Sequence, residues 1–169
     1  QPAEESSSPW NNAGTGHAAL CELNYTPESN GVVNVDKALK INEQFQVSRQ
    51  LWTNLVEDGV ITDPRAFINA VDHTTFAQGP EQMAFMRRRF DALNDEPLFH
   101  DQELIEDHDR FAEYLPLMAE GRDFSTPVSA IRNPNGTDVN FGALTKQYLA
   151  ALSDRGTEIR YGHEVKNIT

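Results

Sequence analysis

The longest stretch of regular hydrophobic spacing runs over residues 36–57. Its apolar side chains recur every three to four positions, as on one face of an α-helix. They are Ala38, Ile41, Phe45, Trp52, Leu55 and Val56. Asp36 is a residue type that caps helix starts, and Gly59 fits the position just past the end. The pattern predicts a long amphipathic helix, which needs other elements to cover its apolar face.

Shorter patterns predict strands and further helices. Residues 66–77 are rich in β-branched and aromatic residues, as strands are. Pro80 opens a second helix, whose arginines at 87–89 point away from its buried stripe. That stripe is Met83, Met86, Phe90 and Leu93. The other predicted elements are helices over 18–24, 109–115 and 142–153, a strand over 128–132, and two short strands within 157–169 that join at Gly162. These elements indicate an α/β fold.

The composition limits the class of partner. The chain of 169 residues carries a net charge of −12, whereas nucleic acid and anionic membranes attract basic surfaces, so we expect no nucleic-acid partner. No apolar run approaches the ~20 residues that span a bilayer, so we expect no transmembrane segment. The single cysteine, Cys21, excludes an internal disulfide and fits a reducing compartment. The five histidines lack metal-binding spacing, so no metal site is predicted.

Residues 11–17, NNAGTGH, place two glycines and a histidine ahead of the predicted helix over 18–24. One interpretation is a tight turn and helix cap, in which glycines allow positive φ and Asn11 or Asn12 binds loop amides. The other is a ligand site, in which glycines admit a large ligand and helix-start amides stabilise its negative charge. His17 at that helix start would favour its neutral form and could accept a proton. The residues alone leave both interpretations open, because neither a dinucleotide fingerprint nor a Walker loop is present.

Two further groups could carry chemistry. His73 alternates with Val71 along the predicted strand, which favours a half-buried, hydrogen-bonded histidine over a catalytic one. Arg87, Arg88 and Arg89 spread through about 200° of helix surface, so one or two at most face a pocket. A bidentate arginine suits a dicarboxylate substrate, whereas a solvated or ion-paired face is the ordinary role of such a cluster.

Residues 5–27, ESSSPWNNAGTGHAALCELNYTP, closely resemble the signature of malate:quinone oxidoreductases, flavoproteins that oxidise malate and reduce quinone. Five more strings resemble that family in order and spacing: INEQFQVSRQLW, FINAVDHTTF, FMRRRFDAL, PLMAEGRD and GTDVNFG. The resemblance covers nearly the whole chain. Where the family commonly has proline before the histidine of the second string, this chain has Asp72.

The resemblance implies a helix-rich α/β fragment of a two-domain FAD-dependent oxidoreductase, with an FAD/NAD(P)-binding-like domain and part of the substrate domain. Residues 1–30 would contact FAD, residues 31–140 would lie on the substrate side, and residues 141–169 would return to the FAD-binding sheet. The cofactor would be FAD. The reaction would convert (S)-malate to oxaloacetate with quinone as acceptor, as in the tricarboxylic acid cycle.

The resemblance also implies roles for individual residues. His17 is the first candidate, as a polar group near the flavin. His73 is the second candidate, as the base. Arg89 is the candidate clamp for a malate carboxylate. The candidate FAD contacts are Ser7, Asn11, Asn12, Ala13, Gly14, Thr15 and Gly16.

Two alternatives stay open: another FAD-dependent 2-hydroxyacid oxidoreductase, and a non-catalytic acidic interaction domain. The family's FAD fingerprint and acidic ribose partner would precede Gln1, so we expect the isolated fragment to be inactive. Strand edges exposed within 157–169 would favour self-association. The expected location is cytoplasmic, either free or peripheral at the inner face of the cell membrane.

Overall fold

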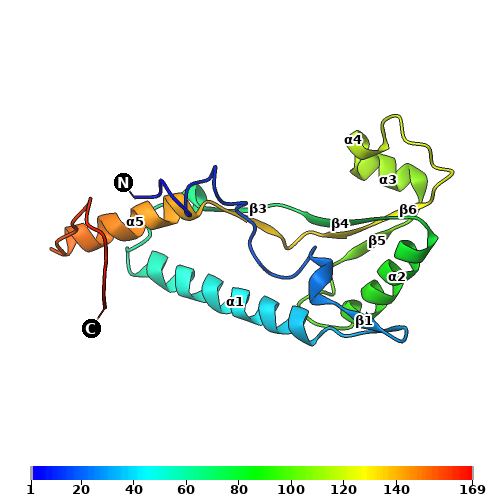
Figure 1. The fold of residues 1–169 in the computed structure, drawn as a ribbon, viewed down its shortest axis with the longest axis horizontal. Coiled ribbons are helices and arrows are strands. Elements are labelled where there is room, and N and C mark those ends of the chain that lie inside the picture. Colours follow the sequence, from blue (N-terminus) through cyan, green and yellow to red (C-terminus); the bar gives the residue numbers. More distant parts are fainter. Residues whose placement is uncertain (1, 169) are drawn as a thin grey trace. The chain divides into compact units, whose positions relative to one another are not determined.

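The computed structural model describes residues 2–168 and mixes helices with short strands (Figure 1). Its contacts divide the chain into two compact units. Unit 1 contains residues 2–16, 48–69 and 138–168, and unit 2 contains residues 17–47 and 70–137. This mixture of helices and strands confirms the predicted α/β fold class. Within the described residues, no helix has both the length and the apolar content to cross a membrane.

The long helix α1 (Asp36–Glu57) has the predicted bounds. Asp36 lies in its first turn rather than ahead of it, and the Asp36 amide donates to the side-chain oxygen of Asn34 at 3.0 Å. Gly59 has a φ of 70°, the left-handed conformation that ends helices and favours glycine. Apolar spacing and a glycine stop are therefore sufficient to locate this element.

The sheet of unit 2 has three antiparallel strands in the order β4-β6-β5. They are β4 (His73–Gln78), β5 (Glu103–Ile105) and β6 (Val128–Asn133). Its register pairs His73 with Asn133 and Glu103 with Arg132. The strand predicted over 128–132 is confirmed. β5 was missed, because a three-residue strand in an acidic stretch has too few residues to show alternation.

Two helical layers cover opposite faces of this sheet (Figure 1). α2 (Pro80–Asn94) packs Met86 against Ala77 and Ile131 on one face. α3 (His108–Tyr114) and α4 (Pro116–Ala119) cover the other face, where Phe111 packs against Val128 and Ala130. Side chains alternate along each strand, so neighbouring residues face different layers. Because Ala77 of β4 packs against Met86 of α2, the β4 side chains at 73, 75 and 77 share the α2 face.

Unit 1 is built around α5 (Phe141–Asp154), close to the predicted 142–153. Its core consists of Ile61, Phe67, Val139 and Leu144. The ring of Trp52 lies edge-on to that of Phe67, with 5.4 Å between the ring centroids. The Gln147 side chain also accepts from the amides of Thr62 and Asp63. The chain enters this core through η2 (Pro64–Ala66), and β3 (Ile68–Ala70) pairs with β7 (Thr137–Val139). The strand predicted over 66–77 is therefore two strands, β3 and β4, in different sheets.

The predicted helix over 18–24 is wrong. Residues 18–22 are irregular, and only η1 (Leu23–Tyr25), one 3-10 turn, forms there. Ala19 has a φ of 56°, which is incompatible with an α-helix. Residues 18–20 are buried, so side-chain burial overrides local helix propensity in this segment.

Two other segments differ from what the sequence patterns indicated. Residues near Asn30, where no regular element was predicted, form a small hairpin of β1 (Glu28–Ser29) and β2 (Val32–Val33). Asn30 and Gly31 both have positive φ, as a two-residue hairpin turn requires. No strand forms within 157–168, and Thr169 lies outside the described residues. The self-association predicted from strand edges in that stretch therefore loses its physical basis there.

Candidate functional site

The glycine loop of unit 1 folds back on the polar segment that precedes it. The side-chain amide of Asn11 donates to the Glu5 carbonyl at 3.1 Å, and that of Asn12 donates to the Ser6 carbonyl at 3.3 Å. The Asn12 side-chain oxygen accepts from the Gly14 amide at 2.9 Å. The asparagines thus satisfy loop polar groups, as the turn interpretation requires.

Gly14 is needed for packing within the chain itself. Its φ is 68°, and an added Cβ would lie 2.7 Å from a carboxylate oxygen of Asp138 and 3.0 Å from the Val139 carbonyl. Thr15 continues this approach through an isolated antiparallel bridge to Asp138. The missing side chain of Gly14 is therefore explained by its contact with β7, without a ligand.

A cavity of about 220 Å³ lies beside this loop. It is lined by Pro9, Asn12, Ala13, Gly14, Asp138, Val139, Asn140 and Phe141. Three of the seven predicted cofactor contacts line it, whereas Ser7, Asn11, Thr15 and Gly16 do not. The Ser7 carbonyl instead approaches Gly142 near the start of α5, at 2.8 Å from an added Cβ. The cavity has amide and carboxylate groups but neither lysine nor arginine in its lining.

In unit 2, His17 pairs with a carboxylate that the sequence analysis did not select. Its Nδ1 lies 3.2 Å from Oε1 of Glu22, and the His17 side chain is 63% exposed whereas that of Glu22 is 21% exposed. The helix expected to follow His17 does not form, so no helix dipole acts on this imidazole. The close approach of one carboxylate oxygen to Nδ1 places this imidazole instead.

His73 is held on both ring nitrogens. Its Nε2 lies 3.2 Å from the Thr137 carbonyl, and its Nδ1 lies 3.9 Å from Sγ of Cys21. A Cβ added at Gly136 would overlap the imidazole, so glycine at 136 makes room for the ring. The residue is 9% exposed. These contacts favour the half-buried, hydrogen-bonded histidine over a base that meets substrate.

Arg89 lies in the buried stripe of α2 and is 0% exposed, which corrects the prediction that all three arginines point away from it. Its Nε donates to the Thr26 hydroxyl at 3.1 Å, and Nη2 donates to the Leu20 carbonyl at 3.4 Å. Its Nη1 has no partner among the described residues. Burial lowers the pKa of Arg89 to about 10, an effect opposed by the charges of Cys21 and Glu22. The other two arginines of the cluster, Arg87 and Arg88, form exposed ion pairs.

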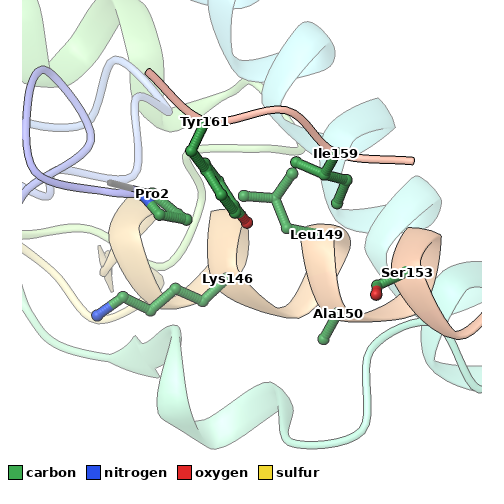
Figure 2. A pocket seen from close by; sticks show the side chains of 7 residues that line it. All are labelled: Pro2, Lys146, Leu149, Ala150, Ser153, Ile159 and Tyr161. Atoms are coloured by element: carbon green, nitrogen blue, oxygen red, sulfur yellow. The ribbon is translucent and has the colours of Figure 1, made fainter. Parts of the chain in front are cut away.

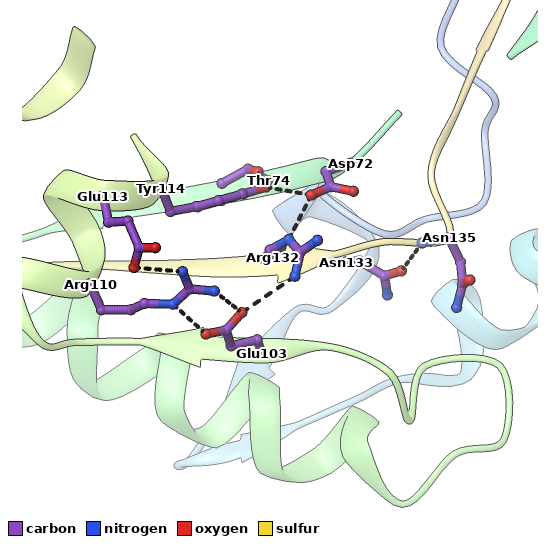
Figure 3. A network of polar contacts seen from close by, with 9 residues as sticks. All are labelled: Asp72, Thr74, Glu103, Arg110, Glu113, Tyr114, Arg132, Asn133 and Asn135. Atoms are coloured by element: carbon purple, nitrogen blue, oxygen red, sulfur yellow. Dashed lines mark hydrogen bonds and ion pairs between the residues drawn. The ribbon is translucent and has the colours of Figure 1, made fainter. Parts of the chain in front are cut away.

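The opposite face of the same sheet carries an ion network (Figure 3). Arg132 donates to Asp72 at 2.6 Å and lies 3.6 Å from Glu103, which also accepts two bonds from Arg110. Tyr114 donates to the same Asp72 oxygen at 3.3 Å. The hydrogen bond from Arg110 is the largest cause that lowers the pKa of Glu103. Asp72 is therefore an ion-pair partner of β6 in this chain.

Comparison with known proteins places the chain in a family. The family model described as malate:quinone oxidoreductase matches residues 1–169. The chain belongs to the malate:quinone oxidoreductase family. Relatives that carry the family's name align with almost every residue of this chain. The resemblance drawn from the sequence strings is therefore confirmed.

Three relatives illustrate the match. The malate:quinone oxidoreductase of Corynebacterium glutamicum (strain ATCC 13032) is 61% identical over 167 residues, covering 99% of this chain and 33% of its own length. The probable malate:quinone oxidoreductase of Rhodococcus erythropolis (strain PR4) is 54% identical over 168 residues, covering 99% and 33%. That of Mycobacterium sp. (strain KMS) is 51% identical over 167 residues, covering 98% and 32%. The chain thus spans about a third of the length of these relatives.

A second cavity of unit 1, of about 290 Å³, lies between α5 and the coil that follows it (Figure 2). Tyr161 and Ile159 from the coil lie over Leu149, and Lys146 extends away from them. None of the residues singled out from the family strings lines this cavity. Among residues 2–168, no group of three or more His, Cys, Asp or Glu residues could hold a metal ion.

The structure distributes the family candidates over the two units. Residues 7–16 belong to unit 1, and unit 2 brings His73 and Arg89 against the segment 17–26, to which His17 belongs. Glu22 was missed because its pairing with His17 crosses an irregular turn without helical spacing. The available signal was a carboxylate five positions after a histidine, which is common by chance.

Proposed function

We propose that this chain forms part of a flavoprotein that oxidises (S)-malate to oxaloacetate and passes the electrons to quinone. The observation that carries the proposal is the family match over residues 1–169, together with identities of 51–61% to relatives named for that activity. Because quinones dissolve in membranes, we also propose a cytoplasmic protein that attaches peripherally to the inner face of the cell membrane.

The cofactor of this proposal is FAD, held within a two-domain architecture. The cavity beside the glycine loop supports contact with a hydroxyl-bearing part of FAD, because Asn12, Asp138 and Asn140 can exchange hydrogen bonds with hydroxyl groups. Its volume of about 220 Å³ is below the ~300–1,000 Å³ of whole small-molecule sites, so it fits a portion of the cofactor. The Asp138 charge would repel phosphate, so we place the phosphates elsewhere.

FAD, when bound, accepts a hydride from the carbon that carries the substrate hydroxyl group. The reaction also needs a base for the hydroxyl proton, and we propose His17 for this role. Its Nδ1 faces Glu22 at 3.2 Å, which leaves Nε2 without a hydrogen-bond partner among residues 2–168. The exposed imidazole can therefore take a proton at Nε2 from a bound 2-hydroxyacid.

The other two candidates have weaker support for direct contact with substrate. Both ring nitrogens of His73 face groups of the chain, so we propose that it supports the fold beneath the segment 17–26. The unpartnered Nη1 of Arg89 would suit a carboxylate, but the complete burial of this residue opposes entry of a substrate. We therefore propose Arg89 as an anchor of the segment 17–26 rather than as a malate clamp.

The test uses the full-length protein purified with its bound cofactor. We expect a flavin absorbance spectrum that bleaches when malate is added without oxygen, and that recovers when a short-chain quinone analogue follows. Parallel titrations with 2-hydroxyglutarate and lactate define the substrate. Replacement of His17 by asparagine should lower the rate constant of flavin reduction by about 10²–10⁴, the usual contribution of a general base.

Two results would count against the proposed function, and a third against the assignment of its base. A protein without flavin would support the alternative of a non-catalytic acidic domain. Faster bleaching by 2-hydroxyglutarate than by malate would support another 2-hydroxyacid oxidoreductase. Unchanged reduction in His17→Asn, with malate still oxidised, would remove only the assignment of the base.

A further inference from the structure

We propose that Glu22 is a positioning residue that orients His17 for proton removal. This inference rests on the proposed oxidation of a 2-hydroxyacid, and it assigns a role to a carboxylate that the sequence strings did not single out. It concerns unit 2 alone, where His17, Glu22 and their supporting residues all lie.

Both carboxylate oxygens of Glu22 are engaged. Oε1 lies 3.2 Å from Nδ1 of His17, and Oε2 accepts from the Cys21 amide at 3.3 Å. A carboxylate held at two points has little freedom to rotate away from the imidazole. The negative charge of Glu22 beside Nδ1 favours the neutral tautomer with its proton on Nδ1, which leaves the lone pair on Nε2, the nitrogen that would accept the proton.

Buried side chains from α2 and from the sheet hold the segment that carries Glu22 in place. Arg89 donates to the Leu20 carbonyl and to the Thr26 hydroxyl, one on each side of Glu22. The Thr75 hydroxyl donates to the Cys21 carbonyl at 2.9 Å. Anchors on both flanks reduce the motion of the turn, which is the support a preorganised catalytic pair requires.

The backbone conformation of this segment is also unusual. Ala19 holds a φ of 56° with its side chain completely buried, a conformation that costs energy for a residue other than glycine. That turn replaces a helix, in which residues five apart would not face each other, and brings Glu22 to His17. Strain of this kind persists only where surrounding contacts determine the geometry.

An ordinary exposed ion pair is the competing explanation. Such a pair contributes little and its loss would not change the chemistry. Glu28 supplies a matched control, because it is 23% exposed and pairs with the exposed Arg88 at 2.7 Å. Glu28→Gln removes a carboxylate of similar exposure from a pair that takes no part in the proposed proton transfer.

The experiment measures flavin reduction by malate in an anaerobic stopped-flow instrument, using the full-length protein with bound FAD. Glu22→Gln is expected to lower the limiting rate constant at least about tenfold, while the malate dissociation constant changes less than about threefold. Glu28→Gln should keep the wild-type rate. In a His17→Asn background, Glu22→Gln should have no further effect, because Glu22 acts through His17.

Two outcomes would overturn the inference while leaving the proposed function intact: a wild-type limiting rate in Glu22→Gln, or an equal further loss when Glu22→Gln is added to His17→Asn. Thermal unfolding of each variant separates these effects from misfolding. If Glu22→Gln fails to fold, Glu22→Asp serves instead, because the shorter side chain keeps the charge but withdraws it from Nδ1. A wild-type protein that malate cannot reduce would instead defeat the proposed function itself.

Discussion

The Sγ atom of Cys21 lies 3.9 Å from Nδ1 of His73, in the half-buried layer between the segment 17–26 and the sheet of unit 2. The thiol is not activated by this neighbour. Burial, followed by the charge of Glu22, raises the pKa of Cys21 from 9.0 to about 11. The thiolate, which is the reactive form, is therefore scarce at neutral pH.

Cys21 should consequently react slowly with alkylating reagents. The rise from 9.0 to about 11 lowers the thiolate fraction at pH 8 by roughly a hundredfold relative to the unfolded chain. Iodoacetamide labelling followed by mass spectrometry would measure the rate for the folded protein, with the same protein in guanidinium as the control. Equal rates in the two conditions would contradict the buried placement of this thiol.

Gly14 offers a test of the two interpretations of the glycine loop. Gly14→Ala should destabilise the FAD-free protein, because its Cβ would lie 2.7 Å from Asp138 and 3.0 Å from the Val139 carbonyl. Gly59→Ala is the control, since Gly59 has a similar φ of 70° but nothing within 4 Å of an added Cβ. The excess loss at Gly14 over Gly59 should be about 1–3 kcal/mol of unfolding free energy, the cost of overpacking.

Chemical denaturation of the FAD-free variants gives both values. If Gly14→Ala and Gly59→Ala unfold alike, and only FAD affinity separates them, the glycine serves cofactor approach rather than packing against β7.

The neighbouring arginines of α2 should differ sharply in their effect on stability. Arg89→Ala leaves a cavity beside the segment 17–26 and removes the groups that donate hydrogen bonds to the Leu20 carbonyl and the Thr26 hydroxyl. The expected loss in the free energy of unfolding is about 2–5 kcal/mol. Arg88→Ala removes an exposed pair with Glu28 and should leave the melting temperature almost unchanged. Thermal unfolding followed by circular dichroism compares them. Similar melting temperatures in the two variants would show that Arg89 is not a buried anchor.

The ion network on the opposite sheet face predicts a dependence of stability on pH. Hydrogen bonding to Arg110 holds the folded-state pKa of Glu103 below its ordinary value of 4.5. A carboxyl group with a lowered folded-state pKa stabilises the protein above its unfolded-state pKa, and this contribution disappears as pH falls through the folded-state pKa. Glu103→Gln should therefore destabilise at pH 7 and make little difference at pH 2.

Urea unfolding of wild type and Glu103→Gln at the two pH values measures this difference. Glu113→Gln is a suitable control, because Glu113 accepts a single bond from Arg110 and is 71% exposed. A stability gap for Glu103→Gln that is as large at pH 2 as at pH 7 would exclude the carboxylate as its source.

Family membership and the longer regular elements could be predicted from the sequence because both depend on local information. The long strings of family residues needed no fold to be recognised. α1 has apolar spacing and a glycine stop within its own residues, and β6 and α5 likewise show their patterns locally. Asn11 and Asn12 bind polar groups at most six residues away, which agrees with the turn interpretation, one of the two that the sequence left open.

The pairing of His17 with Glu22 and the burial of Arg89 were decided by tertiary structure. Arg89 lies three positions after Met86 and four before Leu93, on the apolar stripe, yet a charged residue there is normally expected to face water. Its burial becomes tolerable because the distant Leu20 carbonyl and Thr26 hydroxyl accept its hydrogen bonds. The same packing of the segment 17–26 replaces the expected helix with a turn, since burial of residues 18–20 outweighs a helix propensity of less than about 1 kcal/mol per residue.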